Sequence, residues 1–202
     1  MILYDILKAI FWFVFRLLFR ADISGRENLP QDGPVILAAN HLSNWDPPLL
    51  ACFLSRPVSY MAKVELFEHP LFGAAIRNCH AFPVRRGAAD RGAIKAAVGV
   101  LKQAHVLGLF PEGTRSKDGR MHKAEAGVGL LAAMSGAPVV PACIVGTDRV
   151  FAHGSLLPKF HVRYGAPLYF TGDRRNKEEL EAFSQDIMQH IAVLRAEIEK
   201  NS

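Results

Sequence analysis

A histidine and an aspartate stand five residues apart in the segment NHLSNWD at 40–46, which directly follows an apolar run. On a regular helix this spacing would turn His41 and Asp46 about 140° apart, so the two side chains would not meet. In a turn that leads into a helix, the Asp46 carboxylate can fold back and accept the Nδ1–H of His41, which leaves Nε2 as a base. Such a pair can deprotonate a hydroxyl or a thiol. The alternative is that Asp46 only caps a helix and His41 is a surface histidine.

A second polar segment, FPEGTRS at 110–116, also follows an apolar run. Gly113 lets backbone N–H groups approach an anion, and Arg115 adds a forked donor. The carboxylate of Glu112 could accept hydrogen bonds from a polyol. A third segment, FPVRRG at 82–87, offers two arginines that could clamp a phosphate. An exposed turn with no ligand is the alternative interpretation of this segment.

The basic residues are concentrated in the middle of the chain. The net charge of the whole sequence is +5, and residues 61–123 alone carry a net +6. Such an excess suits phosphate groups on lipid, nucleic acid or a cofactor, and a solvated surface is the plain alternative. Nucleic-acid binding would need aromatic residues between the basic ones, but Phe82 and Phe110 lie in apolar, strand-like runs.

Length and composition exclude several classes of protein. A chain of 202 residues that is 50% hydrophobic can form one domain with a sizeable core, so disorder is excluded as its main state. Cys52, Cys79 and Cys143 form no CxxC pair and no metal-like spacing, which excludes a disulfide scaffold and suggests a reducing compartment. No apolar run approaches 18 residues without a charge, which excludes a polytopic membrane protein. No GxSxG elbow is present, so a serine hydrolase is not supported.

Apolar runs and helical periodicities alternate from residue 22 onward. Strands are expected at 34–39, 58–62, 81–84, 106–110, 139–145 and 160–164. Helices are expected at 47–54, 89–104 and 125–135, followed by a last helix capped by residues 171–173. This order predicts a layered α/β domain with a largely parallel central sheet flanked by helices. Sites in such sheets form at the carboxyl ends of strands, where the polar segments lie.

The first 20 residues form a segment of their own, in which 16 are apolar. On a helical wheel, Asp5, Lys8, Arg16 and Arg20 fall within an arc of about 120°, and the rest of the wheel is almost entirely apolar. This pattern predicts an amphipathic helix at a membrane interface, and a core helix packed on the domain is the alternative. Because Arg16 interrupts the apolar region and no cleavage site follows, a signal peptide is not expected.

Four ordered segments resemble the motifs of the 1-acylglycerol-3-phosphate acyltransferases and related glycerolipid acyltransferases. They are NHxSxxD at 40–46 (the HX4D motif), FPVRR at 82–86, FPEGTRS at 110–116 and VPACIVGTD at 140–148. The resemblance extends from about Ile23 to about Asp148. It implies an enzyme of phospholipid biosynthesis that transfers a fatty acyl group from acyl-CoA or acyl carrier protein to the free hydroxyl of lysophosphatidic acid.

The resemblance also implies roles for single residues. His41 would be the general base, oriented by Asp46, and the activated oxygen would attack the thioester directly. Arg86 would bind the acceptor phosphate. Glu112, Gly113, Thr114 and Arg115 would help to bind the acceptor, with Lys63 as a further basic residue, and Pro141 would be structural or acyl-binding. No metal and no cofactor is expected.

Two residues depart from the family pattern. His80 stands where the family usually has a glycine, and Arg85 replaces a residue that is often acidic. These changes keep another lysolipid acceptor open, as well as a hydrolase that uses His41 and Asp46 to activate water. We expect residues 1–20 to be a membrane-anchoring helix and residues 21–202 the acyltransferase domain, peripheral or monotopic at the cytoplasmic face of a membrane. Its expected partners are membrane lipids and acyl carrier protein, and no nucleic acid.

Overall fold

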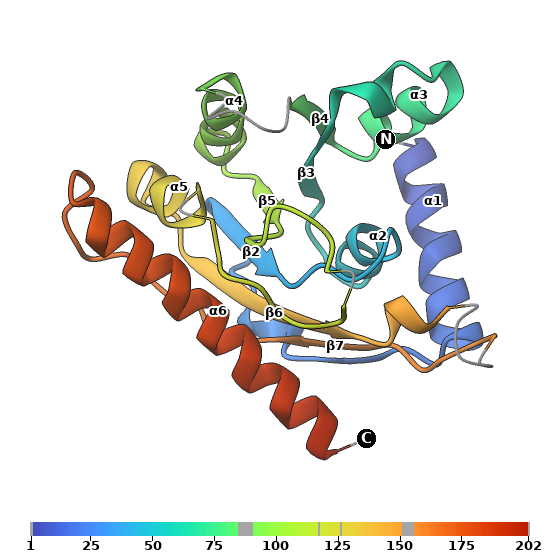
Figure 1. The fold of residues 1–202 in the computed structure, drawn as a ribbon. Helices are drawn as coiled ribbons and strands as arrows, with labels where there is room; N and C mark the ends of the chain where they lie inside the picture. Colours follow the sequence, from blue (N-terminus) through green and yellow to red (C-terminus); the bar gives the residue numbers. More distant parts are fainter. Residues whose placement is uncertain (1, 85–90, 117, 126, 151–155, 202) are drawn as a thin grey trace.

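The computed structural model describes residues 2–84, 91–116, 118–125, 127–150 and 156–201. In this part of the chain, helices cover both faces of a seven-stranded sheet (Figure 1). The α/β class and the largely parallel, helix-flanked sheet predicted from the sequence are confirmed.

The sheet has the strand order β1-β7-β6-β2-β5-β3-β4. Five neighbouring strands run parallel, namely β2 (Val35–Ala39), β3 (Val58–Lys63), β4 (Ala81–Val84), β5 (Val106–Leu109) and β6 (Val139–Val145). At one side, β7 (His161–Tyr164) runs antiparallel to β6 and pairs in parallel with β1 (Asp22–Ser24). The carboxyl ends of the five parallel strands therefore share one edge of the sheet.

Each face of the sheet has its own apolar core. Along β2, Val35, Leu37 and Ala39 join the core on one face, whereas Ile36 and Ala38 join the other. This alternation follows from the period of two residues in a strand. Because helices cover both faces, every residue of β2 is buried, which explains its uninterrupted apolar sequence.

The helices divide between these two cores. The first core holds α2 (Asp46–Cys52) and the end of the N-terminal segment, in which α1 (Ile2–Phe13) continues into a π-helix at Val14–Leu18. The second core holds α4 (Arg91–Lys102), α5 (Gly127–Ser135) and α6 (Lys177–Lys200). The remaining helix, α3 (Pro70–Asn78), lies against α1, β4 and the 3-10 turn Val64–Phe67.

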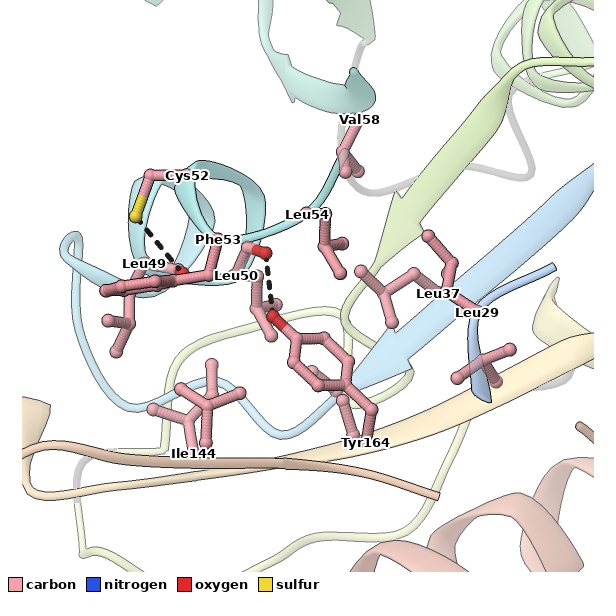
Figure 2. Close-up of a cluster of buried hydrophobic side chains, with 14 of the residues drawn as sticks. Leu29, Leu37, Leu49, Leu50, Cys52, Phe53, Leu54, Val58, Ile144 and Tyr164 are labelled. Carbon is pink, nitrogen blue, oxygen red and sulfur yellow. Dashed lines mark hydrogen bonds between the residues drawn. The ribbon is translucent and has the colours of Figure 1, made fainter. Parts of the chain in front are cut away.

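One hydrogen bond joins α2 to the sheet, and a second lies within the helix itself. The hydroxyl of Tyr164, on β7, donates to the carbonyl of Leu50 at 2.8 Å, and the thiol of Cys52 donates to the carbonyl of Leu49 at 3.6 Å (Figure 2). Leu49 and Leu50 are fully buried. The helix that begins at Asp46 is thus fixed on the sheet by apolar packing and by a side chain from a distant strand.

The N-terminal segment packs on the domain along one side and exposes apolar side chains along the other. Phe15 is fully buried, and its ring lies 5.7 Å from that of Phe160, as in a core helix. The opposite side of the segment exposes a stripe of apolar side chains, Ile6, Ile10, Phe13 and Leu17, each at least half exposed. Among the described residues, no helix has the length and apolar character needed to cross a membrane.

The structure corrects several element boundaries. Helix α3 and strand β1 were not expected, because the first is short and the second has only three residues. Helix α2 begins at Asp46 rather than Pro47. The last helix is not capped by residues 171–173. Its cap is Asn176, whose side chain accepts the N–H groups of Glu178 and Glu179, so the helix starts only at Lys177.

Candidate active site

Three loops at the carboxyl edge of the sheet carry the sequence motifs. Asn40 and His41 follow β2, Phe110 follows β5, and Gly146 and Thr147 follow β6. Since β2 pairs with both β5 and β6, parallel pairing brings these loops together although they are far apart in the sequence. This edge is where open α/β sheets form their sites.

His41 and Asp46 meet in the first of these loops. The Nδ1 atom of His41 lies 2.8 Å from Oδ2 of Asp46. The same oxygen accepts the backbone N–H groups of Leu42 at 2.6 Å and Ser43 at 2.7 Å. Asp46 is completely buried, and only 10% of the His41 side chain is exposed. Because an ionised carboxylate can only accept hydrogen bonds, Nδ1 carries the proton and Nε2 is left with a free lone pair.

An aromatic ring packs against one face of the His41 imidazole. The Phe110 ring stacks on the His41 ring with centroids 3.9 Å apart and planes 15° apart. Tyr60, on β3, lies nearly parallel to Phe110 at 6.1 Å, and its hydroxyl donates to the carbonyl of Pro47. The His41 ring is therefore oriented by a carboxylate at one edge and by an apolar ring on one face.

Two further polar residues hold the loop, and the sequence analysis did not single them out. The hydroxyl of Thr147 donates to Oδ1 of Asp46 at 2.6 Å. The amide of Asn40 bonds to both backbone groups of Ile144, accepting its N–H at 2.8 Å and donating to its carbonyl at 2.9 Å. Both residues stand inside the recognised motifs at 40–46 and 140–148, but only the fold shows that these two segments touch.

Glu112 points into the protein. Its Oε1 atom accepts the backbone N–H of His41 at 3.3 Å, and Oε2 accepts that of His122 at 2.9 Å. Only 7% of Glu112 is exposed. The carboxylate expected to contact a polyol acceptor thus joins the loop after β5 to the backbone of His41. A second link runs between the same segments, because the N–H of Ser116 donates to the carbonyl of His41 at 2.8 Å.

The other predicted acceptor residues surround this pair of loops. Gly113 has a φ of +69°, a left-handed conformation that suits glycine, and its N–H closes a turn on the carbonyl of Phe110. Thr114 and Arg115 follow it and are exposed. Lys63 is exposed at the carboxyl end of β3, beside Val84 of β4. Arg86 lies outside the described residues.

His80 lies directly before β4, at its amino end. It follows α3 with a φ of +59°, and its ring meets the Tyr4 ring edge-on at 5.1 Å. A left-handed residue after a helix is usually glycine, so the backbone here is one that a histidine seldom adopts. The His80 ring contacts α1, and residues 85–90, which carry the two arginines, lie outside the described residues.

The described part of the chain holds no cluster of three histidine, cysteine or acidic residues that could ligate a metal ion. Burial raises the pKa of the Cys52 thiol to about 12 and that of the Cys143 thiol to about 12, so both stay protonated at neutral pH. What the site offers is an imidazole oriented through Nδ1 by a buried carboxylate, with exposed cationic side chains on the loops at the same edge of the sheet. This arrangement can take a proton from a hydroxyl group near an anionic substituent.

Comparison with known proteins shows which family the chain is similar to. A sequence model of the family named Acyltransferase matches residues 20–145. The chain is 32% identical to a 1-acyl-sn-glycerol-3-phosphate acyltransferase of Bacillus subtilis over 185 residues, which cover 88% of this chain and 89% of the relative. It is 34% identical over 140 residues to the chloroplastic 1-acyl-sn-glycerol-3-phosphate acyltransferase BAT2 of Brassica napus, covering 68% of this chain and 40% of the relative.

A solved structure gives the same result at the level of the fold. The crystal structure of the 1-acyl-sn-glycerophosphate (LPA) acyltransferase PlsC from Thermotoga maritima superposes with a TM-score of 0.77 at 28% identity. The match covers 96% of this chain and 80% of that one. The family model, the relatives and the shared helix-flanked α/β fold together define the class of the protein. The chain belongs to the acyltransferase family.

Proposed function

We propose that this protein transfers a fatty acyl group from an acyl thioester to the free hydroxyl of lysophosphatidic acid, giving phosphatidic acid for phospholipid synthesis. The observation that carries the proposal is the buried contact between Nδ1 of His41 and the carboxylate of Asp46, which leaves Nε2 of the imidazole without a partner from Asp46 and able to act as the base. The names of the relatives support the choice of acceptor.

In the proposed reaction, Nε2 of His41 takes the proton of the acceptor hydroxyl while its oxygen attacks the thioester carbonyl. A C–O bond forms, and the tetrahedral intermediate collapses with breakage of the C–S bond. The imidazolium then returns its proton to the departing sulfur, so the thiol of coenzyme A or of acyl carrier protein is released. Asp46 stabilises the imidazolium between the two proton transfers. The reaction balances without a cofactor.

The acceptor phosphate is proposed to bind beside this pair. Lys63 and Arg115 are exposed cations at the carboxyl ends of neighbouring strands β3 and β5. The turn at Gly113 and Thr114 supplies backbone groups near the same edge. Arg86 belongs to this set by its motif. A phosphate held there would place the glycerol hydroxyl toward His41.

Residues 1–20 are proposed to rest in the membrane interface, with residues 21–202 forming the enzyme domain at the cytoplasmic face. Support comes from the exposed apolar stripe on the N-terminal segment and from Leu71 and Phe72 of α3, which are also exposed. Helices α1 and α3 touch each other, so both can face one lipid surface. Such a position would give the acyl chains of both substrates a short path to the site.

The experiment is an acyl-transfer assay on purified protein in detergent with acyl-CoA or acylated carrier protein as donor and lysophosphatidic acid as acceptor. We expect thiol release that depends on the acceptor. His41→Ala should lower the rate by about 10² to 10⁴ without unfolding the protein. Thiol release without any acceptor would instead indicate a hydrolase. Equal turnover by His41→Ala would overturn the mechanism.

A further inference from the structure

We propose that Thr147 is a positioning residue of the active site, which acts through Asp46 on the proton affinity of His41. This inference rests on the proposed function of the His41–Asp46 pair. Its basis is the hydrogen bond from the Thr147 hydroxyl to Oδ1 of Asp46 at 2.6 Å, between a threonine that is 1% exposed and an aspartate that is completely buried.

The two oxygens of Asp46 have different partners. Oδ2 receives His41 and the backbone N–H groups of Leu42 and Ser43, all from its own loop. Within the described structure, Oδ1 has one hydrogen-bond donor, Thr147. Because both carboxylate oxygens are hydrogen-bonded, the carboxylate is held against rotation about its Cβ–Cγ bond. Without Thr147, a buried anionic oxygen would lose its donor, and the orientation of Oδ2 toward His41 would rest on the local loop alone.

The sheet, rather than the local sequence, places this hydroxyl. Thr147 follows Gly146, whose φ of +97° and close approach to the carbonyl of Lys159 leave no room for a side chain. Upstream, both backbone groups of Ile144 bond to the amide of Asn40, the residue before His41. The end of β6 is thus fixed to the end of β2 on one side and to the segment before β7 on the other. A threonine 101 residues from Asp46 in sequence is held at bonding distance.

A hydrogen bond to a carboxylate favours its ionised form and therefore lowers the affinity of the coupled His–Asp pair for a further proton. Removal of the Thr147 hydroxyl should raise the apparent pKa of the pair. Because the base works only when that proton is absent, activity should then be lost at a higher pH on the acidic side. Tyr60 and Glu112 are the other titratable groups that face the site. Both are present in the variant and in the wild type, so they do not account for a difference between the two pH profiles.

The test compares Thr147→Val, which removes the hydroxyl but keeps the shape, with Thr147→Ser, which restores a hydroxyl. Acyl transfer by each is measured against pH with saturating and limiting lysophosphatidic acid. We expect Thr147→Val to lower kcat about tenfold with little change in the acceptor KM, and to shift the acidic limb of the profile to higher pH. Thr147→Ser should restore most of the lost kcat and most of the wild-type position of the acidic limb.

Ser184→Ala is the matched control, because the Ser184 hydroxyl is also buried but bonds to Leu180 and Gly129 between α5 and α6. It should lower stability without moving the pH profile. If Thr147→Val does not fold, Thr147→Ala removes the same hydroxyl with less crowding and is interpreted in the same way. An acidic limb at the wild-type position in the Thr147 variants would overturn the inference. Full activity of His41→Ala would instead overturn the proposed function.

Discussion

The ring of Phe110 stacks on the imidazole of His41 with their centroids 3.9 Å apart. Phe110 is the first residue of the FPEGTRS segment, so a motif expected to serve the acceptor also packs against His41. The loop after β5 reaches His41 twice more, through the Glu112 carboxylate and the Ser116 N–H. The segments that carry the first and third motifs therefore form one unit.

Replacing Phe110 should test the value of this ring contact. Phe110→Leu keeps apolar bulk but removes the stacking, which is worth about 0.5–1.5 kcal/mol for aromatic pairs. We expect kcat/KM to fall by roughly 2- to 12-fold. Steady-state kinetics in detergent would measure the effect, with Phe110→Tyr as the control that keeps the ring. Wild-type kinetics for Phe110→Leu would show that the ring does not position His41.

Glu112→Gln should destabilise the loop as well as slow the reaction. The two Glu112 oxygens accept the backbone N–H groups of His41 and His122. A glutamine has only one side-chain oxygen, so it can accept only one of these N–H groups, and its own NH₂ group then faces the other N–H. We expect a cost of about 1–3 kcal/mol, which would lower Tm by several degrees. Thermal unfolding followed by circular dichroism would measure it. Glu181→Gln, at an exposed pair with Lys177, should leave Tm unchanged; equal Tm values for both variants would argue against this role of Glu112.

Charges placed on the apolar stripe should weaken membrane binding. Ile10 and Phe13 are 51% and 60% exposed, so lysines there should be tolerated by the fold. Burial of such a side chain in lipid is worth about 1.5–3 kcal/mol, and we expect the double variant Ile10→Lys/Phe13→Lys to bind vesicles at least tenfold more weakly. Co-sedimentation with vesicles containing anionic lipid would show this.

The matched control for that experiment carries the same two charges elsewhere on the surface. Tyr169 and Val193 are 63% and 58% exposed, and α6, which carries Val193, packs on the other face of the sheet. Tyr169→Lys/Val193→Lys should sediment like the wild type. If the α1 variant also does so, the stripe is not the anchor.

Stability should decrease at acidic pH partly because of His161. Burial, followed by the nearby Lys159, lowers the pKa of His161 below its ordinary value, although Asp22 opposes the shift. The folded protein then binds the proton less readily than the unfolded chain. This contribution to stability is present above about pH 6.5 and is lost as the pH falls toward the lower pKa of the folded state.

Urea unfolding at pH 7.5 and pH 5 would measure this dependence. We expect His161→Gln to reduce the difference between the two midpoints. His190→Gln, on the exposed side of α6, serves as the control and should leave the difference as in the wild type. A His161→Gln protein with the full wild-type pH dependence would remove His161 as a cause.

The architecture and the contact between His41 and Asp46 were both predictable from patterns within short segments of the chain. Apolar runs such as 34–39 and 139–145 predict buried strands, because strands covered on both faces need uninterrupted apolar sequence. The alternation of strands and helices predicts a parallel sheet, and that topology predicts a site at its carboxyl edge. The contact of His41 with Asp46 was predictable, because it forms within one short loop.

The groups that reach His41 and Asp46 from distant segments could not be predicted, because their positions depend on the fold. Whether Glu112 faces an acceptor or the backbone depends on the path of its loop over β2, and the contact of Thr147 with Asp46 depends on the pairing of β6 with β2. The contact of the His80 ring with Tyr4 likewise depends on how α1 packs against α3. Local spacing fixes contacts within a turn, whereas contacts between loops depend on strand order and register, which no single segment encodes.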